Sequence, residues 1–371
     1  MPVNHSEPHP QSRRERPRHV HRAVHFVGSL PAQLTPNDRS TMQWILDHSY
    51  PAALTALPCD PDPRSITDFL NGFASTPAWE LAKRGDSTDY HDLPVHRIAA
   101  RHQLTAGDLA LGRPSHVAAL MDARLQLDTH DLRLPAAQVS IPNALDLALA
   151  TYGDPATALP RLPRLQDAIG AEITEISRQW RDEVVLQLES PVTLTTLEKA
   201  PRQRWETLAR GLAYQLAGMI SQAPADTRWI VHLRYGDPAR THTPLFTPQD
   251  LVAPVLVCNA LSARLRKLRY PMPPVHIPIS HGHAPPSQEP HFYAALRHLR
   301  RDINVIAGVV DEAHPDQSRH ALRLVEATLD RTAYAVAATC GLSHRTPAAA
   351  TDNAALAVTL AAMDYDEDRT R

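Results

Sequence analysis

The sequence predicts an α/β protein, a single (β/α)8 (TIM) barrel with a disordered N-terminal arm. Short apolar runs of strand length recur along the chain, and amphipathic stretches of helix length separate them. Strands that alternate with helices at such intervals are typical of parallel β-α units. The chain offers eight strand candidates, and that number favours a closed barrel over an open doubly wound sheet.

The first part of the chain is expected to be the least regular. Residues 1–22 hold five arginines and no apolar periodicity, which predicts a disordered basic arm. A first strand is expected at Val24–Val27, ending at the turn Gly28–Pro31, and a second at Leu54–Cys59. Residues 84–103 are charged, contain histidines and are poorly periodic, so we expect an excursion from the barrel there.

From there the rhythm is regular, and one barrel domain is expected over residues 23–371. The further strands are expected at Ala137–Ile141, Val184–Leu188, Trp229–Leu233, Val275–Ile279, Ile303–Val310 and Tyr334–Ala338. Helices are expected at Asp167–Arg181, Trp205–Ile220, Pro248–Leu268, Pro290–Arg300 and Gln317–Leu329. No G-x-G-x-x-G motif follows any of these strands and there is no P-loop, which argues against a Rossmann-type nucleotide site.

Charge and composition narrow the class of protein. The 371 residues carry 38 basic and 40 acidic side chains, a formal net charge of -2, and lack the basic excess that a nucleic-acid partner would favour. No uncharged apolar run reaches the roughly 18 residues of a membrane span, and the polar N-terminus lacks the apolar core of a signal peptide. Three cysteines are too few for a disulfide framework. We therefore expect a cytoplasmic protein that acts on a small molecule, with its oligomeric state open.

The barrel prediction also says where chemistry should lie. Active sites of such barrels sit at the carboxyl ends of the strands. Polar strand-end residues also occur wherever a chain leaves a sheet for a loop, so position alone assigns no role. The polar residues at the expected strand ends are Ser29, Cys59, Asp60, Asn143, Glu189, His232, Arg234, Ser280 to His283, Asp311, Glu312 and Cys340.

His232 and Arg234 form the first candidate pair. They are two residues apart on one expected strand, so their side chains point to the same side. If that side is the barrel interior, the pair would combine a metal ligand or general acid/base with an anion-binding arginine. The alternative is that both face a helix and share an ion pair, and spacing leaves the choice open.

Three other strand-end features each allow two interpretations. His281 and His283 are alternate imidazoles that can bind zinc only with further ligands, and such a pair also arises by chance among 21 histidines. Cys340 is either a small buried apolar residue or a thiolate near a metal or cation. Glu189 is either a helix-cap partner or a catalytic carboxylate.

Five segments carry a resemblance to a known family: Gly28–Pro31, Leu186–Pro191, Trp229–Asp237, Ile306–His314 and Cys340–Arg345. In this order they resemble strand ends of the catalytic barrel of cobalamin-independent methionine synthase. Trp229–Asp237 is similar to that family's His-x-Cys strand, and Cys340–Arg345 to its Cys-Gly-Leu-Lys-Thr-Arg signature. The chain length matches the short, single-barrel members of the family.

The resemblance implies a zinc ion, held in the family by His, Cys, Glu and Cys, that activates a thiol for methyl transfer from a folate. His232 and Cys340 match two of the ligands. Arg234 replaces the first cysteine, and the glutamate expected near Val275–Ser280 is absent. Arginine cannot ligate zinc, and its charge beside a divalent ion is unfavourable. We therefore expect the standard zinc site to be lacking. The alternative is a histidine-rich zinc site in which His281 or His283 joins Cys340.

The residues favour a divergent methionine-synthase-like enzyme, in the superfamily that includes the metal-free uroporphyrinogen decarboxylase. Its substrate would be a small anionic or thiol-bearing metabolite. The reaction would be group transfer, as in a methyltransferase, or lyase or decarboxylase chemistry. The alternative is a catalytically inactive paralogue that serves as a binding or scaffold protein. The expected site residues are His232, Glu189 and Asp311 as catalytic groups and Ser29, Asn143, Arg234 and Glu312 as substrate-binding groups.

Overall fold

The computed structural model describes residues 22–58, 69–70, 72–73, 76–85, 93–105, 107–128, 134–235, 247–280 and 284–365. Of the expected basic arm only Arg22 belongs to these residues. Cys59, Asp60, His281 and His283 also lie outside them, so the structure does not bear on the roles predicted for these residues.

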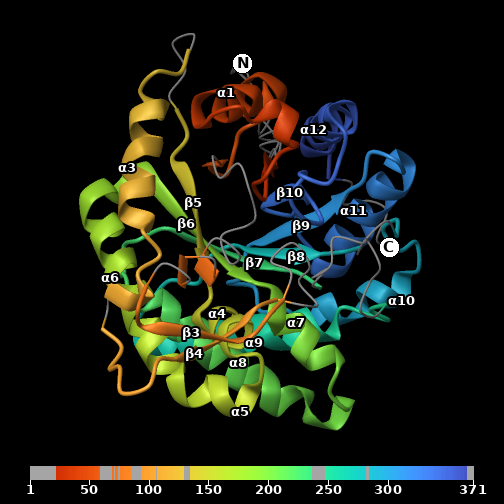
Figure 1. The fold of residues 1–371 in the computed structure, drawn as a ribbon. Coiled ribbons are helices and arrows are strands. Elements are labelled where there is room, and N and C mark those ends of the chain that lie inside the picture. The colour runs from red at the N-terminus through yellow and green to blue at the C-terminus, as the bar shows by residue number, and fades with distance from the viewer. Residues whose placement is uncertain are drawn as a thin grey trace, which may run out of the picture.

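Parallel strands build one curled sheet in the described part of the chain (Figure 1). They are β1 (Ala23–Val24), β2 (Leu57–Pro58), β5 (Ala137–Pro142), β6 (Val184–Ser190), β7 (Trp229–Leu233), β8 (Val275–Pro278), β9 (Val305–Val310) and β10 (Ala335–Ala338). Their order is β1-β10-β9-β8-β7-β6-β5-β2, and each pairing is parallel. The predicted α/β class with eight parallel strands is confirmed.

The outermost strands of this order, β1 and β2, approach each other through the residues just before β2. Val24 forms an isolated parallel bridge with Leu54. Its amide donates to the carbonyl of Ala53 at 2.8 Å, and its carbonyl accepts the amide of Thr55 at 3.0 Å. Together with the strand order, this bridge gives the sheet the arrangement of a TIM-barrel-like fold.

Helices lie around the sheet (Figure 1). Several of them carry a proline in the first turn, where its missing N–H removes no helical hydrogen bond. In the described residues no helix has the length and apolarity needed to cross a membrane. The helices are α1 (Asp38–Ser49), α3 (Arg113–Arg124), α4 (Ala144–Tyr152), α5 (Pro155–Ala158), α6 (Leu162–Trp180), α7 (Pro191–Glu198), α8 (Trp205–Ile220), α9 (Val252–Leu268), α10 (Pro290–Tyr293), α11 (Pro315–Leu329) and α12 (Pro347–Ala361).

A separate antiparallel hairpin lies between β2 and α3 in the chain. Its strands are β3 (Trp79–Lys83) and β4 (Val95–Ile98), and β4 packs against α4 (Figure 1). Trp79 stacks on Phe73, with ring centroids 4.0 Å apart. Both residues belong to the main hydrophobic core, so they anchor the hairpin to the rest of the protein.

The interior of the curled sheet has an apolar layer at the amino ends of the strands. This layer is a cluster distinct from the main core and contains Ala56, Val185, Ile230, Ile306, Ala335 and Ala337, with Ala23 and Ala136 packed against it. Alternate residues of a strand point to the same face. Residues two positions after members of this layer therefore also face the interior. They include Gly308 and four polar residues: His25, Gln138, Gln187 and His232.

Candidate functional site

A row of three histidines lies in this interior, one layer above the apolar one. His25 follows β1, His232 belongs to β7 and His276 to β8, and at most 1% of each residue is exposed. The Nδ1 atoms of His232 and His276 are 2.9 Å apart. His276 Nε2 lies 2.9 Å from the carbonyl oxygen of Ala338. The His25 and His276 ring centroids are 6.0 Å apart, so the three rings form one connected group.

Burial keeps these imidazoles uncharged. Loss of hydration lowers the pKa of His232 well below its ordinary value, and the nearby His276, Arg234 and His25 lower it further. Burial likewise lowers the pKa of His276 to about 4, although carbonyl oxygens of Ala338 and Leu233 partly oppose the shift. Near neutral pH these rings are neutral hydrogen-bonding groups rather than cations.

A carboxylate on the neighbouring strand faces the row. Glu189 Oε2 lies 3.9 Å from His232 Nε2, and residues 189 and 232 are paired in the β6–β7 register. The side-chain amide of Gln187 donates to Glu189 Oε1 at 2.6 Å and to the carbonyl of Val27 at 2.6 Å. The amide of Gln138 donates to the same carbonyl at 2.9 Å. Two buried amides thus tie the end of β1 to β5 and β6 and help to orient Glu189.

A second carboxyl group lies near Arg234, which comes directly after β7. Asp146, in the first turn of α4, is 3% exposed, and its Oδ1 accepts the amide of Val192 at 2.7 Å. Burial raises the pKa of Asp146 to about 7, against the opposing effects of the Val192 amide and the charge of Arg234. Asp146 is therefore a buried acid able to hold or release a proton near neutral pH.

Asn143 and Ser29 have structural partners. Asn143 caps α4, since its side chain accepts the amide of Leu145 at 3.2 Å. Ser29 lies in the turn after β1, and its carbonyl accepts the amide of Leu342 at 2.8 Å. A Cβ atom at Gly341 would lie 2.2 Å from Ser29 Oγ. The Ser29 turn and the loop that holds the half-buried, free thiol of Cys340 therefore pack together.

Asp311 and Glu312, also expected in the site, make local contacts beyond β9. Asp311 Oδ2 lies 3.0 Å from His314 Nδ1, and its Oδ1 accepts the amide of Ala313 at 3.0 Å. Glu312 accepts Arg345 Nε at 2.7 Å and the side-chain amide of Asn353 at 2.7 Å. These carboxylates fix the loops after β9 and β10. In the described residues, the structure brings together His232, Glu189 and Arg234 from the expected set.

Sequence analysis did not single out His25, His276, Gln187 or Asp146 as site residues. A signal for Asp146 was present, because it is the one charged residue in the apolar stretch Ala144–Ala150. Gln187 was visible in the same way inside the apolar strand β6. The two histidines carried no comparable signal, because their role depends on neighbours from other strands.

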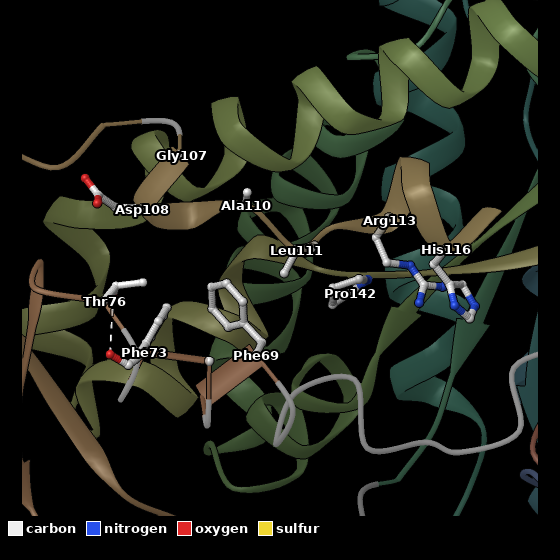
Figure 2. Close-up of a pocket in the computed structure, with 11 residues that line it drawn as sticks. Phe69, Phe73, Thr76, Gly107, Asp108, Ala110, Leu111, Arg113, His116 and Pro142 are labelled. Atoms are coloured by element: carbon white, nitrogen blue, oxygen red, sulfur yellow. Dashed lines mark hydrogen bonds between the residues drawn. The ribbon is translucent and has the colours of Figure 1, made fainter. Parts of the chain in front are cut away.

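A cavity of about 320 Å³ lies beside the carboxyl end of β5 (Figure 2). Figure 2 shows Arg113 and His116 next to Pro142 at one end, while Phe69 and Phe73 lie further along it. Pro142 is paired with Glu189 in the β5–β6 register. The cavity is thus lined by aromatic and basic side chains, together with Asp108, and reaches β5, whose neighbour β6 carries Glu189.

The donor set does not fit the zinc site of the family that the sequence resembles. His232 Nε2 is the one ring nitrogen of His232 left to bind a ligand, and His276 has both ring nitrogens in hydrogen bonds. Arg234 is close enough to His232 to lower its pKa further. In the described part of the chain, no three His, Cys, Asp or Glu side chains are grouped so that they could hold a metal ion.

Comparisons with known proteins agree on the fold. No model of a known protein family matches the sequence, and no curated protein matches it. A B12-independent methionine synthase from a Shewanella species, solved in complex with selenomethionine, is similar in structure with a TM-score of 0.56 and 12% identity, over 92% of this chain and 96% of that chain. A methyltransferase from Methanosarcina mazei is similar in structure with a TM-score of 0.51 and 10% identity, over 92% of this chain and 93% of that chain. The chain shares the fold of these two proteins. The predicted resemblance is thereby confirmed in the fold.

Proposed function

We propose that the chain is an enzyme that binds a small anionic metabolite at the carboxyl ends of β6–β8 and transfers a proton there. One observation carries the proposal: His232 Nε2, fully buried, has no hydrogen-bond partner among the described residues and lies 3.9 Å from Glu189 Oε2. An unsatisfied buried nitrogen costs free energy. Such a cost is expected where a ligand completes the hydrogen bonds.

Each group has a role in this proposal. Arg234 would bind the anionic group of the substrate, because a guanidinium forms charge-assisted, two-pronged hydrogen bonds with carboxylates and phosphates. His232 Nε2 would accept a proton from an S–H, O–H or N–H group of the substrate. Glu189 would stabilise the imidazolium that results. Asp146, with a pKa of about 7, would return or remove a proton in a later step.

Group transfer is the reaction class that we favour, because one structural neighbour is named a methyltransferase and the other a methionine synthase. In this proposal the strands form a complete (β/α)8 barrel, with the Val24–Leu54 bridge as its seam. A closed barrel would place Glu189, His232 and Arg234 around one mouth. Neither the methyl donor nor the substrate follows from these residues.

Binding measurements test the proposal. Titration calorimetry with succinate, inorganic phosphate, cysteine and homocysteine should show binding of at least one probe. Arg234→Gln should weaken that binding by about 10-fold or more, because a hydrogen bond to a charged group contributes about 1.5–3 kcal/mol. Arg210→Gln, which changes an arginine with 66% of its side chain exposed, is the matched control. Failure of every probe, or equal weakening in both variants, would favour the scaffold alternative.

A second measurement tests the proton acceptor. If a thiol probe binds, the ultraviolet absorbance of its thiolate should appear on mixing with the wild-type protein. His232→Gln should remove this absorbance while changing the affinity only a few-fold, because it removes the proton acceptor and leaves Arg234 in place. Thiolate formation that persists in His232→Gln would assign the proton to another group.

A further inference from the structure

We propose that His276 is a positioning residue that fixes the tautomer of His232, and that Gly308 provides the space for its imidazole. The arrangement leaves His232 Nε2 as an unprotonated acceptor that points toward Glu189. It therefore selects ligands that present a hydrogen-bond donor between these two residues. The tautomer follows from the geometry of the strands, whereas its use in binding a substrate rests on the proposed function.

A backbone carbonyl group determines which ring nitrogen of His276 carries the hydrogen. The oxygen of Ala338 lies 2.9 Å from His276 Nε2 and can only accept a hydrogen bond. His276 Nε2 must therefore carry a hydrogen, since two lone pairs would otherwise face each other at hydrogen-bonding distance. A neutral imidazole carries a single N–H, so His276 Nδ1 is an acceptor.

The second ring follows from the first. His232 Nδ1 lies 2.9 Å from His276 Nδ1, and a contact of this length requires one donor and one acceptor. Because His276 Nδ1 accepts, His232 Nδ1 donates. His232 is itself neutral, since burial and the neighbouring rings and Arg234 oppose a charge. Its Nε2 atom is therefore the lone-pair nitrogen.

The Nε2 atom of His232, at the far end of this hydrogen-bonded pair of rings, faces another acceptor. Glu189 Oε2 lies 3.9 Å from His232 Nε2, and a carboxylate oxygen accepts hydrogen bonds. The lone pair of His232 Nε2, which has no partner among the described residues, gains if a donor approaches it. The ligand class is thus a small anion whose anionic group reaches Arg234 and whose S–H, O–H or N–H group lies at His232 and Glu189.

Gly308 on β9 makes the arrangement sterically feasible. A Cβ atom at position 308 would lie 2.8 Å from His276 Nε2, 2.8 Å from the carbonyl of Ile277 and 3.1 Å from Pro278 Cα. Two of these three atoms are backbone, so the imidazole would have to move. A larger residue at position 308 should therefore break the hydrogen bond from His276 to Ala338 that determines the tautomers of His276 and His232.

Nuclear magnetic resonance of the protein with 15N-labelled histidine tests the inference without any ligand. Long-range 1H–15N spectra, assigned with His232→Gln and His276→Leu, should show His276 as the Nε2–H form and His232 as the Nδ1–H form. His276→Gln should preserve the His232 form, because its amide can donate to Ala338 and accept from His232. His276→Leu should abolish the preference for Nδ1–H at His232.

A second variant keeps the test decisive if His276→Leu fails to fold. Gly308→Ala should change the tautomer signal of His232, whereas Gly211→Ala, where a Cβ meets no atom within 4 Å, should not. An Nε2–H form of His232 in the wild-type protein would overturn the inference, as would a His232 signal that none of these variants changes. The expected tautomers together with no binding of any anion would instead reject only the proposed function.

Discussion

At the amino end of the strands, the guanidinium of Arg22 is enclosed by acceptors, whereas at the carboxyl end His232 Nε2 has no hydrogen-bond partner in the described residues. Arg22 Nε and Nη2 donate to the two oxygens of Glu326, each at 2.5 Å, and Nη1 donates to the carbonyl of Met363. Glu326 Oε1 also accepts the amide of Ala333 at 2.9 Å. Every nitrogen of this buried guanidinium is used.

The contrast separates stability from function. A buried ion pair with all its hydrogen bonds made joins β1 to α11 and to the chain after α12, and it offers no group to a ligand. The carboxyl end instead contains His232 Nε2, which has no hydrogen-bond partner among the described residues, and Asp146, an acid with a pKa of about 7. In barrels of this kind the amino end serves stability and the carboxyl end serves chemistry. Three substitutions test whether this division holds here.

The largest effect is expected at the amino end. Glu326→Ala leaves the charge of Arg22 buried without its partner, so the free energy of unfolding should fall by about 3–5 kcal/mol. Urea denaturation followed by circular dichroism measures the loss. Glu206→Ala, at a carboxylate with 75% of its side chain exposed, should change stability by no more than about 0.5 kcal/mol. A similar small change in both variants would show that the buried pair of Arg22 and Glu326 contributes no more to stability than an exposed carboxylate does.

An intermediate effect is expected from crowding the histidine row. Gly308→Ala places a methyl group 2.8 Å from His276 Nε2, and overpacking of this kind costs about 1–3 kcal/mol. In the helix α8, Gly211→Ala should instead stabilise the protein by about 0.5–1 kcal/mol. Thermal unfolding of the two variants checks the difference in sign. Stabilisation by both would mean that the row is loosely packed.

The smallest effect concerns Asp146 and depends on pH. Its folded-state pKa of about 7 lies above the ordinary value of 3.8. The folded protein therefore binds the extra proton between these values, and stability from this group is lost as pH rises through about 7. Asp146→Asn should be more stable than the wild type at pH 8, and the advantage should shrink as the pH falls and vanish toward pH 4. Urea titrations at both pH values measure it. An advantage that is independent of pH would show that Asp146 does not titrate in this range.

Much of the fold could be predicted from local pattern. The expected ranges Trp205–Ile220 and Trp229–Leu233 coincide with α8 and β7, because the first is long and periodic in its apolar residues and the second is apolar except for His232. The first strand was expected at Val24–Val27, but regular pairing ends at Val24. Its later residues form the turn whose carbonyls accept the amides of Gln138 and Gln187 instead. That exchange of partners involves residues distant in the chain, so it has no local signature.

The sequence by itself determined the parallel β-α rhythm and which residues lie two apart along a strand, because side-chain alternation along a strand is a local property. Only the tertiary structure decided which polar groups meet. His25 follows β1, whereas His232 and His276 belong to β7 and β8, up to 251 positions away in the chain, and the sheet register brings them together. The tertiary structure also shows that Asp311 contacts His314 in its own loop and that Glu312 binds Arg345 in the loop after β10. A hydrogen bond depends on distance and direction in space, and those are fixed only when the sheet curls.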